Sequence, residues 1–318
     1  MGVLLVKKTT ELTTEEINRI NRLFLDVMKH TRTEEGFKRL YLNTPLGYSY
    51  HIMLMEGEEL IGFHSGLPFY YLNNGKRFIA GLGIDTMTAV GHRDFFNVRD
   101  MFVACEKAMK EEGCTLRIGF PNDNSYPVLK KGFKYKDIGK LDTFFLPIRI
   151  GGVKPSLRIL NPFSRLFAWC VIQWSRFSIN NQFCEYQYQK EHSTFDKGRY
   201  KWYDGNYQTV EIGDVTAHYK VSNHEGVKTA FIIDVTPRSK RVFDAVVREV
   251  YKREGKSIDL IMYVGHLTFS PMSLIKMPHK YEPKHFNFTC KPLDNDAFDD
   301  SLYDIDNWDV NLSNYDLI

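Results

Sequence analysis

The sequence predicts an α/β protein of two domains, each a mixed, mostly antiparallel sheet flanked by helices. Three observations carry this prediction. At 318 residues, the chain is longer than one typical domain. Its first 150 residues give the element order β-α-α-β-β-β-α-β-α-β, which differs from the alternation of a doubly wound fold. A rhythm of strand, polar turn, helix and strand returns from residue 227, which indicates an internal duplication.

The first elements follow from local signals near the amino terminus. A short apolar run before Lys7 and Lys8 predicts a first strand. Thr13, followed by an acidic pair at 15–16 and by apolar residues at helical spacing, is typical of a helix start. A second, short helix over residues 34–43 should end before Pro45, because the residue before a proline disfavours helix.

Two turn signals then predict three hairpin-connected strands. Gly57 and the Asn73-Asn74-Gly75 turn separate β-rich runs at 48–56, 59–72 and 77–88. A polar loop follows, then a helix over 98–113, a strand over 115–120 and a short helix within 121–135. We expect residues 141–150 to close this domain as its last strand.

Composition limits the classes of function. The chain has 42 basic and 39 acidic residues, and this balance argues against nucleic acid as a general partner. Five scattered cysteines without a C-x-x-C spacing argue against a disulfide framework and against a metal site. The amino terminus has the wrong order of charge and apolar residues for a signal peptide, so we expect a cytoplasmic protein.

Residues 151–184 form an apolar linker with a different character. The run at 163–177 carries Trp169, Trp174, Arg165 and Arg176, and it is too short to span a bilayer. Two interpretations are open: a helix in peripheral contact with a membrane, or an interdomain helix clamped between two cores. We favour the clamp, because the polar face is poor for a free amphipathic helix. The acidic, aromatic tail at 294–318 should pack as an extended segment.

Several motifs of the first half resemble one enzyme superfamily. They are IGFHSGLP, TMTAVGHRDFFNV, YLNTPLGY and, as the most specific, GFPNDNSYPVLKKGFKYKDIGKL. These motifs resemble the GNAT (Gcn5-related) acyltransferases, in particular those common in bacterial surface-polysaccharide gene clusters. The resemblance covers about residues 1–150, and residues 185–318 resemble a second, divergent GNAT-like domain. The predicted domains are therefore 1–150 and 185–318, joined by the linker at 151–184.

The resemblance implies acetyl-CoA, or another acyl-CoA, as co-substrate. The implied acceptor is an amino or hydroxyl group on a sugar or nucleotide-sugar. The splayed ends of two neighbouring strands would receive the pantetheine arm, and a backbone N–H would polarise the thioester carbonyl. A base would take the acceptor's proton, and a hydroxyl would protonate the departing thiolate.

The loop that should hold the pyrophosphate departs from the family pattern. The pattern begins with Arg or Gln, which Arg93 matches, but Phe96 and Val98 stand where the family has small residues. A phosphate could still bind through Arg93, Arg99 and the helix end, with less preorganisation. The basic loop at 237–241 also lacks glycine, and we favour a solvated turn there over a phosphate site. The expected co-substrate residues are Thr88, Arg93, Asp94, Phe95, Phe96, Asn97, Val98, Asn122 and Asn124.

Four residues are candidates for catalysis. The tyrosine that commonly protonates CoA sulfur in this superfamily falls on Val128, so Tyr126 or Ser125 would have to replace it. For Tyr126, packing of the short helix is an equally good interpretation. Asp85 and His64 are candidate bases, and for both we favour a structural role. Asn122 and Asn124 could bind pantetheine amides or fix the loop after the strand.

The sequence thus predicts an acyl-CoA-dependent N- or O-acetyltransferase of surface-polysaccharide biosynthesis. One alternative is a catalytically degenerate tandem-GNAT protein that binds a glycan or protein partner, which the missing glycines favour. Another is a transferase with a non-CoA donor such as charged tRNA. The balanced charge weighs against that donor, because a tRNA groove needs a basic stripe.

Overall fold

The computed structural model describes residues 2–29, 32–191, 207–224, 226–282 and 284–315. The chain divides into two compact units, each made of three segments. The first unit consists of Met1–Gly139, Gln187–Asp204 and Asn287–Asn307. The second unit consists of Lys140–Tyr186, Gly205–Phe286 and Trp308–Ile318.

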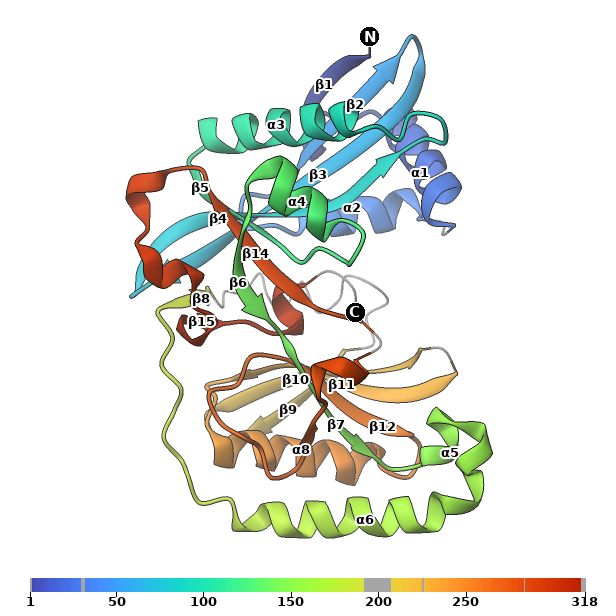
Figure 1. Cartoon of the computed structure of the whole chain (residues 1–318), viewed down its shortest axis with the longest axis vertical. Coiled ribbons are helices and arrows are strands. Elements are labelled where there is room, and N and C mark those ends of the chain that lie inside the picture. The colour runs from blue at the N-terminus through green and yellow to red at the C-terminus, as the bar shows by residue number, and fades with distance from the viewer. Residues whose placement is uncertain (1, 30–31, 192–206, 225, 283, 316–318) are drawn as a thin grey trace. The chain divides into compact units, whose positions relative to one another are not determined.

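The first unit is a sheet with helices on both faces (Figure 1). Its strands follow the order β1-β2-β3-β4-β5-β14-β6, and β8 pairs with the far end of β3. The pair β4–β5 is parallel, whereas β1–β2, β2–β3, β3–β4 and β5–β14 are antiparallel. Its elements are β1 Val3–Lys8, α1 Thr14–Met28, α2 Glu34–Leu42, β2 Tyr50–Glu56, β3 Glu59–Asn73, β4 Lys76–Thr88, α3 Phe95–Glu111, β5 Cys114–Gly119, α4 Tyr126–Phe133, β6 Lys136–Lys140, β8 Tyr188–Lys190 and β14 Asn287–Pro292.

Alternation along the strands sends side chains to two separate cores. On one face, Met101 and Cys105 of α3 pack against Ile52 of β2. On the other face, Phe37 and Tyr41 of α2 contact the ring of His51. Successive strand residues point to opposite faces, so both sides of this sheet need apolar residues. This explains why β2 and β3 are buried along nearly their whole length.

The second unit is built around a smaller sheet with the order β13-β7-β12-β11-β10-β9. Its core joins the sheet to α8 and to Ala168 and Ile172 of α6. In β11–α8–β12 two parallel strands are linked by a helix, as in β4–α3–β5. Its elements are β7 Asp142–Pro147, α5 Ile150–Val153, α6 Asn161–Trp174, β9 Tyr207–Ile212, β10 Val215–His224, β11 Val227–Thr236, α8 Lys240–Glu254, β12 Leu260–Gly265, β13 Ile275–Lys276 and β15 Trp308–Asp309.

The fold class is confirmed: each unit is a mixed sheet flanked by helices. The division into units, however, differs from the expected boundaries 1–150, 151–184 and 185–318. Strand β7, expected to close the first domain, pairs with β12 in the second sheet. Strand β14 takes the edge of β5 in the first sheet. Pairing partners this distant in sequence cannot be deduced from local pattern.

We had expected the linker helix to be clamped between two cores, and the core that α6 joins is that of the second unit. Only Ala168 and Ile172 of this helix are buried, and Phe163, Trp169 and Trp174 are exposed. The tail also differs from the expected extended segment. It packs, with Leu302, Trp308 and Leu312 buried, but mainly as short 3-10 turns, and residues 316–318 lie outside the described part.

Buried histidines should make the first unit sensitive to acid. Burial lowers the pKa of His51 to about 3 and that of His64 well below its usual range. In the unfolded chain both protonate near pH 6.5, so stability falls as the pH drops below that value. At pH 5 the loss should be about 2 kcal/mol for each histidine. Urea unfolding at pH 7 and pH 5 measures this loss in the free energy of unfolding.

His51→Asn is the control for that experiment, because asparagine retains hydrogen-bonding groups and does not titrate. The variant should lose about half of the pH dependence. An unchanged slope between pH 7 and pH 5 would contradict the assignment.

Candidate functional site

The parallel strand pair β4–β5 of the first unit ends early. β4 and β5 pair from Ile79↔Cys114 to Leu82↔Ile118. Beyond that point β5 ends at Gly119, whereas β4 continues to Thr88 along β3. The backbone of β4 thus runs on without a β5 partner and leads into the loop before α3. The splayed strand ends that the resemblance implies would begin at this point.

A β-bulge lies in the unpaired part of β4. The β3–β4 register changes from Ser65↔Ile84 to Phe63↔Met87, so Asp85 and Thr86 together oppose His64. Asp85 has a φ of 49°, a left-handed conformation that aspartate tolerates better than most residues. A bulge bends its strand and increases the local twist. Here it turns the end of β4 at the point where pairing with β5 has already stopped.

The Asp85 carboxylate fixes this bulge through its Oδ2 atom. It accepts a hydrogen bond from Arg32 Nη1 at 2.7 Å and another from the Tyr41 hydroxyl. Burial, and then the charge of Asp85, raise the pKa of Tyr41 well above its usual range, so this phenol remains a donor. Asp85 therefore lies in a hydrogen-bond network that holds the backbone of the bulge.

His64 lies in the interior with both ring nitrogens engaged. Its Nε2 accepts from Arg117 Nη2 at 3.1 Å, so Nδ1 carries the proton and donates to Thr86 Oγ1 at 2.9 Å. Burial, and then the Arg117 charge, lower the pKa of His64 well below its usual range. The ring stacks on Phe102. A neutral, enclosed imidazole in this position connects Arg117 to the bulge.

The buried Arg117 guanidinium depends on two glycines that the sequence analysis did not single out. Gly66 and Gly83 pair across β3 and β4. A Cβ on Gly66 would lie 2.9 Å from Nη1 of Arg117, and a Cβ on Gly83 would lie 2.8 Å from Nη2. Arg117 is fully buried. The glycines within strand residues 62–83 could have indicated this site, because glycine inside a strand often marks the close approach of another group to the backbone.

The amino terminus of α3 is already occupied by a carboxylate. Asp94 caps the helix and accepts from the Asn97 backbone N–H at 2.8 Å. The Asn97 side chain donates to Asp94 Oδ2 at 2.6 Å and to the His92 carbonyl at 3.1 Å. A helix amino terminus attracts one anion, and here the chain supplies it. Arg93 is exposed beside this cap.

The two phenylalanines of this loop have different environments. The ring of Phe95 stacks against Phe133 of α4, and a Cβ on Gly132 would lie 2.5 Å from it. Phe96 is 62% exposed, and its ring carries the Arg99 guanidinium at 5.1 Å from the centroid. Arg99 also pairs with Asp100 at 2.7 Å. Val98 joins the small cluster between α3 and α4.

The loop after β5 is organised by Asn122. Its Oδ1 accepts from the backbone N–H groups of Asn124 and Ser125 at 3.1 and 2.9 Å and from Ser125 Oγ at 3.0 Å. Asn124 is exposed. The Tyr126 hydroxyl donates to Asp137 Oδ1 at 2.9 Å. Burial, and then hydrogen bonding to Asp137, raise the pKa of Tyr126, so the phenol keeps its proton.

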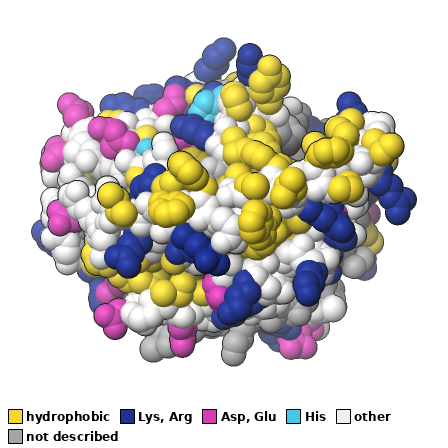
Figure 2. All heavy atoms as spheres, turned by 90° about the horizontal axis from the view of Figure 1, so that it is seen from below, with side chains coloured by type: hydrophobic (Ala, Val, Ile, Leu, Met, Phe, Trp, Pro, Cys, Tyr) yellow, Lys and Arg dark blue, Asp and Glu magenta, His cyan; other side chains and the backbone are white. Residues whose placement is uncertain are grey.

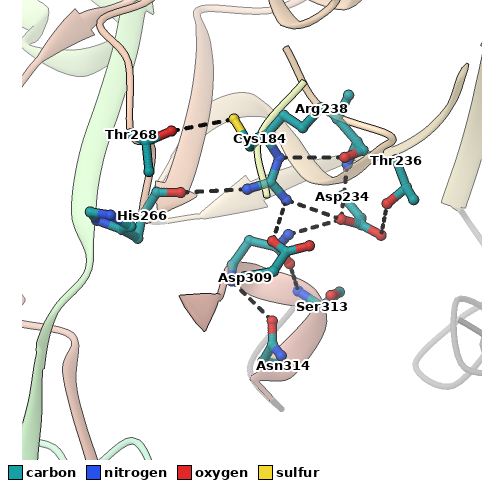
Figure 3. Close-up of polar contacts among 11 residues, drawn as sticks. Cys184, Asp234, Thr236, Arg238, His266, Thr268, Asp309, Ser313 and Asn314 are labelled. Atoms are coloured by element: carbon teal, nitrogen blue, oxygen red, sulfur yellow. Dashed lines mark hydrogen bonds and ion pairs between the residues drawn. The ribbon is translucent and has the colours of Figure 1, made fainter. Parts of the chain in front are cut away.

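In the second unit the corresponding strand ends are filled by the chain itself. β11 and β12 pair in parallel only as far as Ile232↔Tyr263. Figure 3 shows the buried Arg238, from the loop before α8, aimed at Asp309 and Asp234. Its Nη2 lies 2.7 Å from Asp309 Oδ1 and 3.6 Å from Asp234 Oδ1. Asn311 completes the cluster through a hydrogen bond to Asp234 at 2.8 Å.

Comparison with known proteins identifies the fold of this chain. No protein-family model matches the chain, and no curated protein matches its sequence. Solved structures do match. A probable N-acyltransferase of unknown function from Enterococcus faecalis is 11% identical with a TM-score of 0.58, over 92% of this chain and 73% of that one. A GCN5-related N-acetyltransferase from Kribbella flavida is 12% identical with a TM-score of 0.57, over 92% and 72%.

Eis1 from Mycobacterium abscessus is similar at 11% identity and a TM-score of 0.57, over 93% of this chain and 75% of that one. The chain has the GCN5-related N-acetyltransferase fold. At such identities the likeness concerns the fold, and the site must be judged on its own residues.

The first unit agrees in part with the site that the family resemblance implies. The strand ends, the bulge and the start of α3 lie in succession along the chain, with Thr88 as the last residue of β4. The anion position, however, differs from the GNAT loop pattern, because Asp94 occupies the helix end. In the second unit Asp309 holds the loop arginine. The basic loop at 237–241 is therefore neither a solvated turn nor a free phosphate site at Arg238.

Asp309→Asn should destabilise the second unit by about 2–4 kcal/mol, because a buried guanidinium then loses its nearest counter-charge. Thermal or urea unfolding followed by circular dichroism measures this loss. Asp300→Asn, at an exposed position of the tail, is the charge-matched control and should change stability little. Equal effects of the two substitutions would show that the Arg238 pairing is unimportant.

Proposed function

We propose that the first unit is an acyl-CoA-dependent N- or O-acetyltransferase that acts on a sugar or nucleotide-sugar in surface-polysaccharide biosynthesis. The observation that carries the proposal is the parallel pair β4–β5, which stops pairing at Leu82↔Ile118 just ahead of the bulge. Unpaired backbone N–H and C=O groups at a strand end can pair with the amides of a pantetheine arm. The GNAT fold supports acyl transfer, and the sugar acceptor rests on the sequence motifs.

Bound acetyl-CoA would supply the activated acetyl group as a thioester. A backbone N–H of β4 beyond the bulge would stabilise negative charge on the carbonyl oxygen. Tyr126, which keeps its proton, is the hydroxyl we assign to the departing sulfur, to which it would donate in place of Asp137. Asp85 and His64 are positioning residues in this scheme, because their polar atoms hold the bulge and Arg117. The proton that the acceptor loses would therefore pass to solvent water.

One observation favours a second candidate function. The Asp94 carboxylate at the start of α3 disfavours a pyrophosphate there, as expected of a degenerate domain that binds a glycan or protein partner. The two candidates differ in how the protein interacts with acetyl-CoA. An enzyme binds it and transfers its acetyl group, whereas a degenerate domain does neither.

Asp94→Asn should tighten acetyl-CoA binding about two- to fivefold. Asparagine caps a helix as well as aspartate, and the substitution removes one negative charge from the position of the pyrophosphate. Isothermal titration calorimetry of the whole chain measures the change. Acetyl-pantetheine, which has no phosphate, is the matched ligand, and its affinity should stay the same.

The outcomes separate the candidates. Binding of neither compound by either protein would contradict the transferase and leave the degenerate domain. An equal gain for both compounds would show that Asp94 acts on the fold and not on a phosphate.

Tyr126→Phe should lower the rate of acetyl transfer about a hundredfold and leave the KM for acetyl-CoA unchanged. The assay follows acetylated product by mass spectrometry with a panel of nucleotide-linked amino sugars. Ser125→Ala is the matched control, since its hydroxyl bonds only within its own loop. A full rate in Tyr126→Phe and a loss in Ser125→Ala would reverse the assignment.

A further inference from the structure

Helix α6 of the second unit has an inverted distribution of side chains. Its inward positions include the small residues Ser164 and Ala168, and Ser175 lies buried just after its last residue. Apart from the buried Ile172, the largest apolar residues lie on the outward side. Soluble helices place their large apolar residues inward, so this pattern calls for a second apolar environment outside the protein.

The outward residues and those of the adjoining turns form one continuous stretch of sequence, which we call the α6 face. Figure 2 shows hydrophobic side chains gathered across this side of the molecule, with Lys and Arg side chains among them. Its exposed members are Ile159 (83%), Leu160 (42%), Phe163 (70%), Leu166 (59%), Phe167 (44%), Trp169 (52%), Trp174 (65%), Phe177 (69%) and Ile179 (88%).

The face is held in place and does not need a partner to fold. Ala168 and Ile172 belong to the core of the second unit. Arg248 of α8 donates to the Ser175 carbonyl at 2.7 Å, and Ser164 donates to the Ile148 carbonyl at 2.9 Å. Binding through this face therefore involves little ordering of the backbone, which favours association.

The segment that carries the face has charge of one sign. Residues 143–184 contain no Asp or Glu, whereas Lys154, Arg158, Arg165 and Arg176 are basic, and the fifth cation, Arg149, is paired with Asp259 at 2.8 Å. A surface with large apolar and aromatic residues and arginines among them complements anionic lipid headgroups over an acyl layer. A second copy of this chain fits poorly, because a symmetric interface would bring the same arginines together.

We propose that the α6 face docks the protein on an anionic lipid bilayer. The helix lies along the membrane surface, with Trp169, Trp174 and Phe163 in the interfacial layer and Arg165 and Arg176 at lipid phosphates. No helix within the described residues is long and apolar enough to cross a bilayer. With 14 residues α6 is about 21 Å long, so it contributes an in-plane contact.

Flotation of the whole chain with vesicles tests this proposal. The protein should float with phosphatidylcholine vesicles that contain phosphatidylglycerol and bind much less to phosphatidylcholine alone. The triple variant Phe163→Ser, Trp174→Ser, Phe177→Ser should lose at least tenfold in binding. The double variant Arg165→Glu, Arg176→Glu should lose at least tenfold on anionic vesicles only.

The matched control replaces three exposed apolar side chains of the first unit: Val3→Ser, Val6→Ser and Leu25→Ser. It should bind vesicles as the parent chain does. Circular dichroism confirms that each variant is folded, and an unfolded triple variant is replaced by the arginine pair. Absence of vesicle binding by the parent chain would overturn the proposal. So would concentration-dependent dimerisation that the triple variant abolishes while vesicle binding is unchanged.

Discussion

The bulge in β4 is the constraint on which the first unit's site depends. It exists because Asp85 adopts a left-handed conformation, and its carboxylate is held there by Arg32 and the Tyr41 hydroxyl. On the other face, Thr86 is tied through His64 to the buried Arg117. The strand end is thus fixed from both sides of the sheet. A strand end held in this way is preorganised, and the proposed transfer reaction would need such a fixed backbone donor.

The two units share one strand arrangement but differ in what occupies the region beyond the paired strands. Each has a parallel strand pair, a connecting helix and an early end to the pairing. In the second unit the tail brings Asp309 to Arg238 and closes the position with a buried ion pair. In the described part of the first unit, the helix end is occupied by the exposed cap of Asp94. An exposed cap is easily displaced, whereas a buried pair is not, and so the first unit is the better candidate for a ligand.

The sequence predicted the local order of elements well, because turns, caps and periodicity are local signals. It could not predict that β7 belongs to the second sheet and β14 to the first, since those pairings join residues more than a hundred positions apart. The same limit applied to Asp309, which reaches Arg238 from 71 positions away. The sequence shows that α6 is apolar. Which of its faces packs inward depends on where the small residues meet the core, and composition does not give this. Gly66 and Gly83 carried a usable signal for the Arg117 site, and it was overlooked.

The central claim is that the end of β4 receives a thioester-bearing arm beyond Leu82. Hydrogen–deuterium exchange of the whole chain with and without acetyl-CoA tests this most directly. The account predicts slower exchange in peptides that cover residues 83–90, with little change in the corresponding peptides of β11 at 233–239. Protection elsewhere in the chain, with residues 83–90 unaffected by saturating acetyl-CoA, would contradict it.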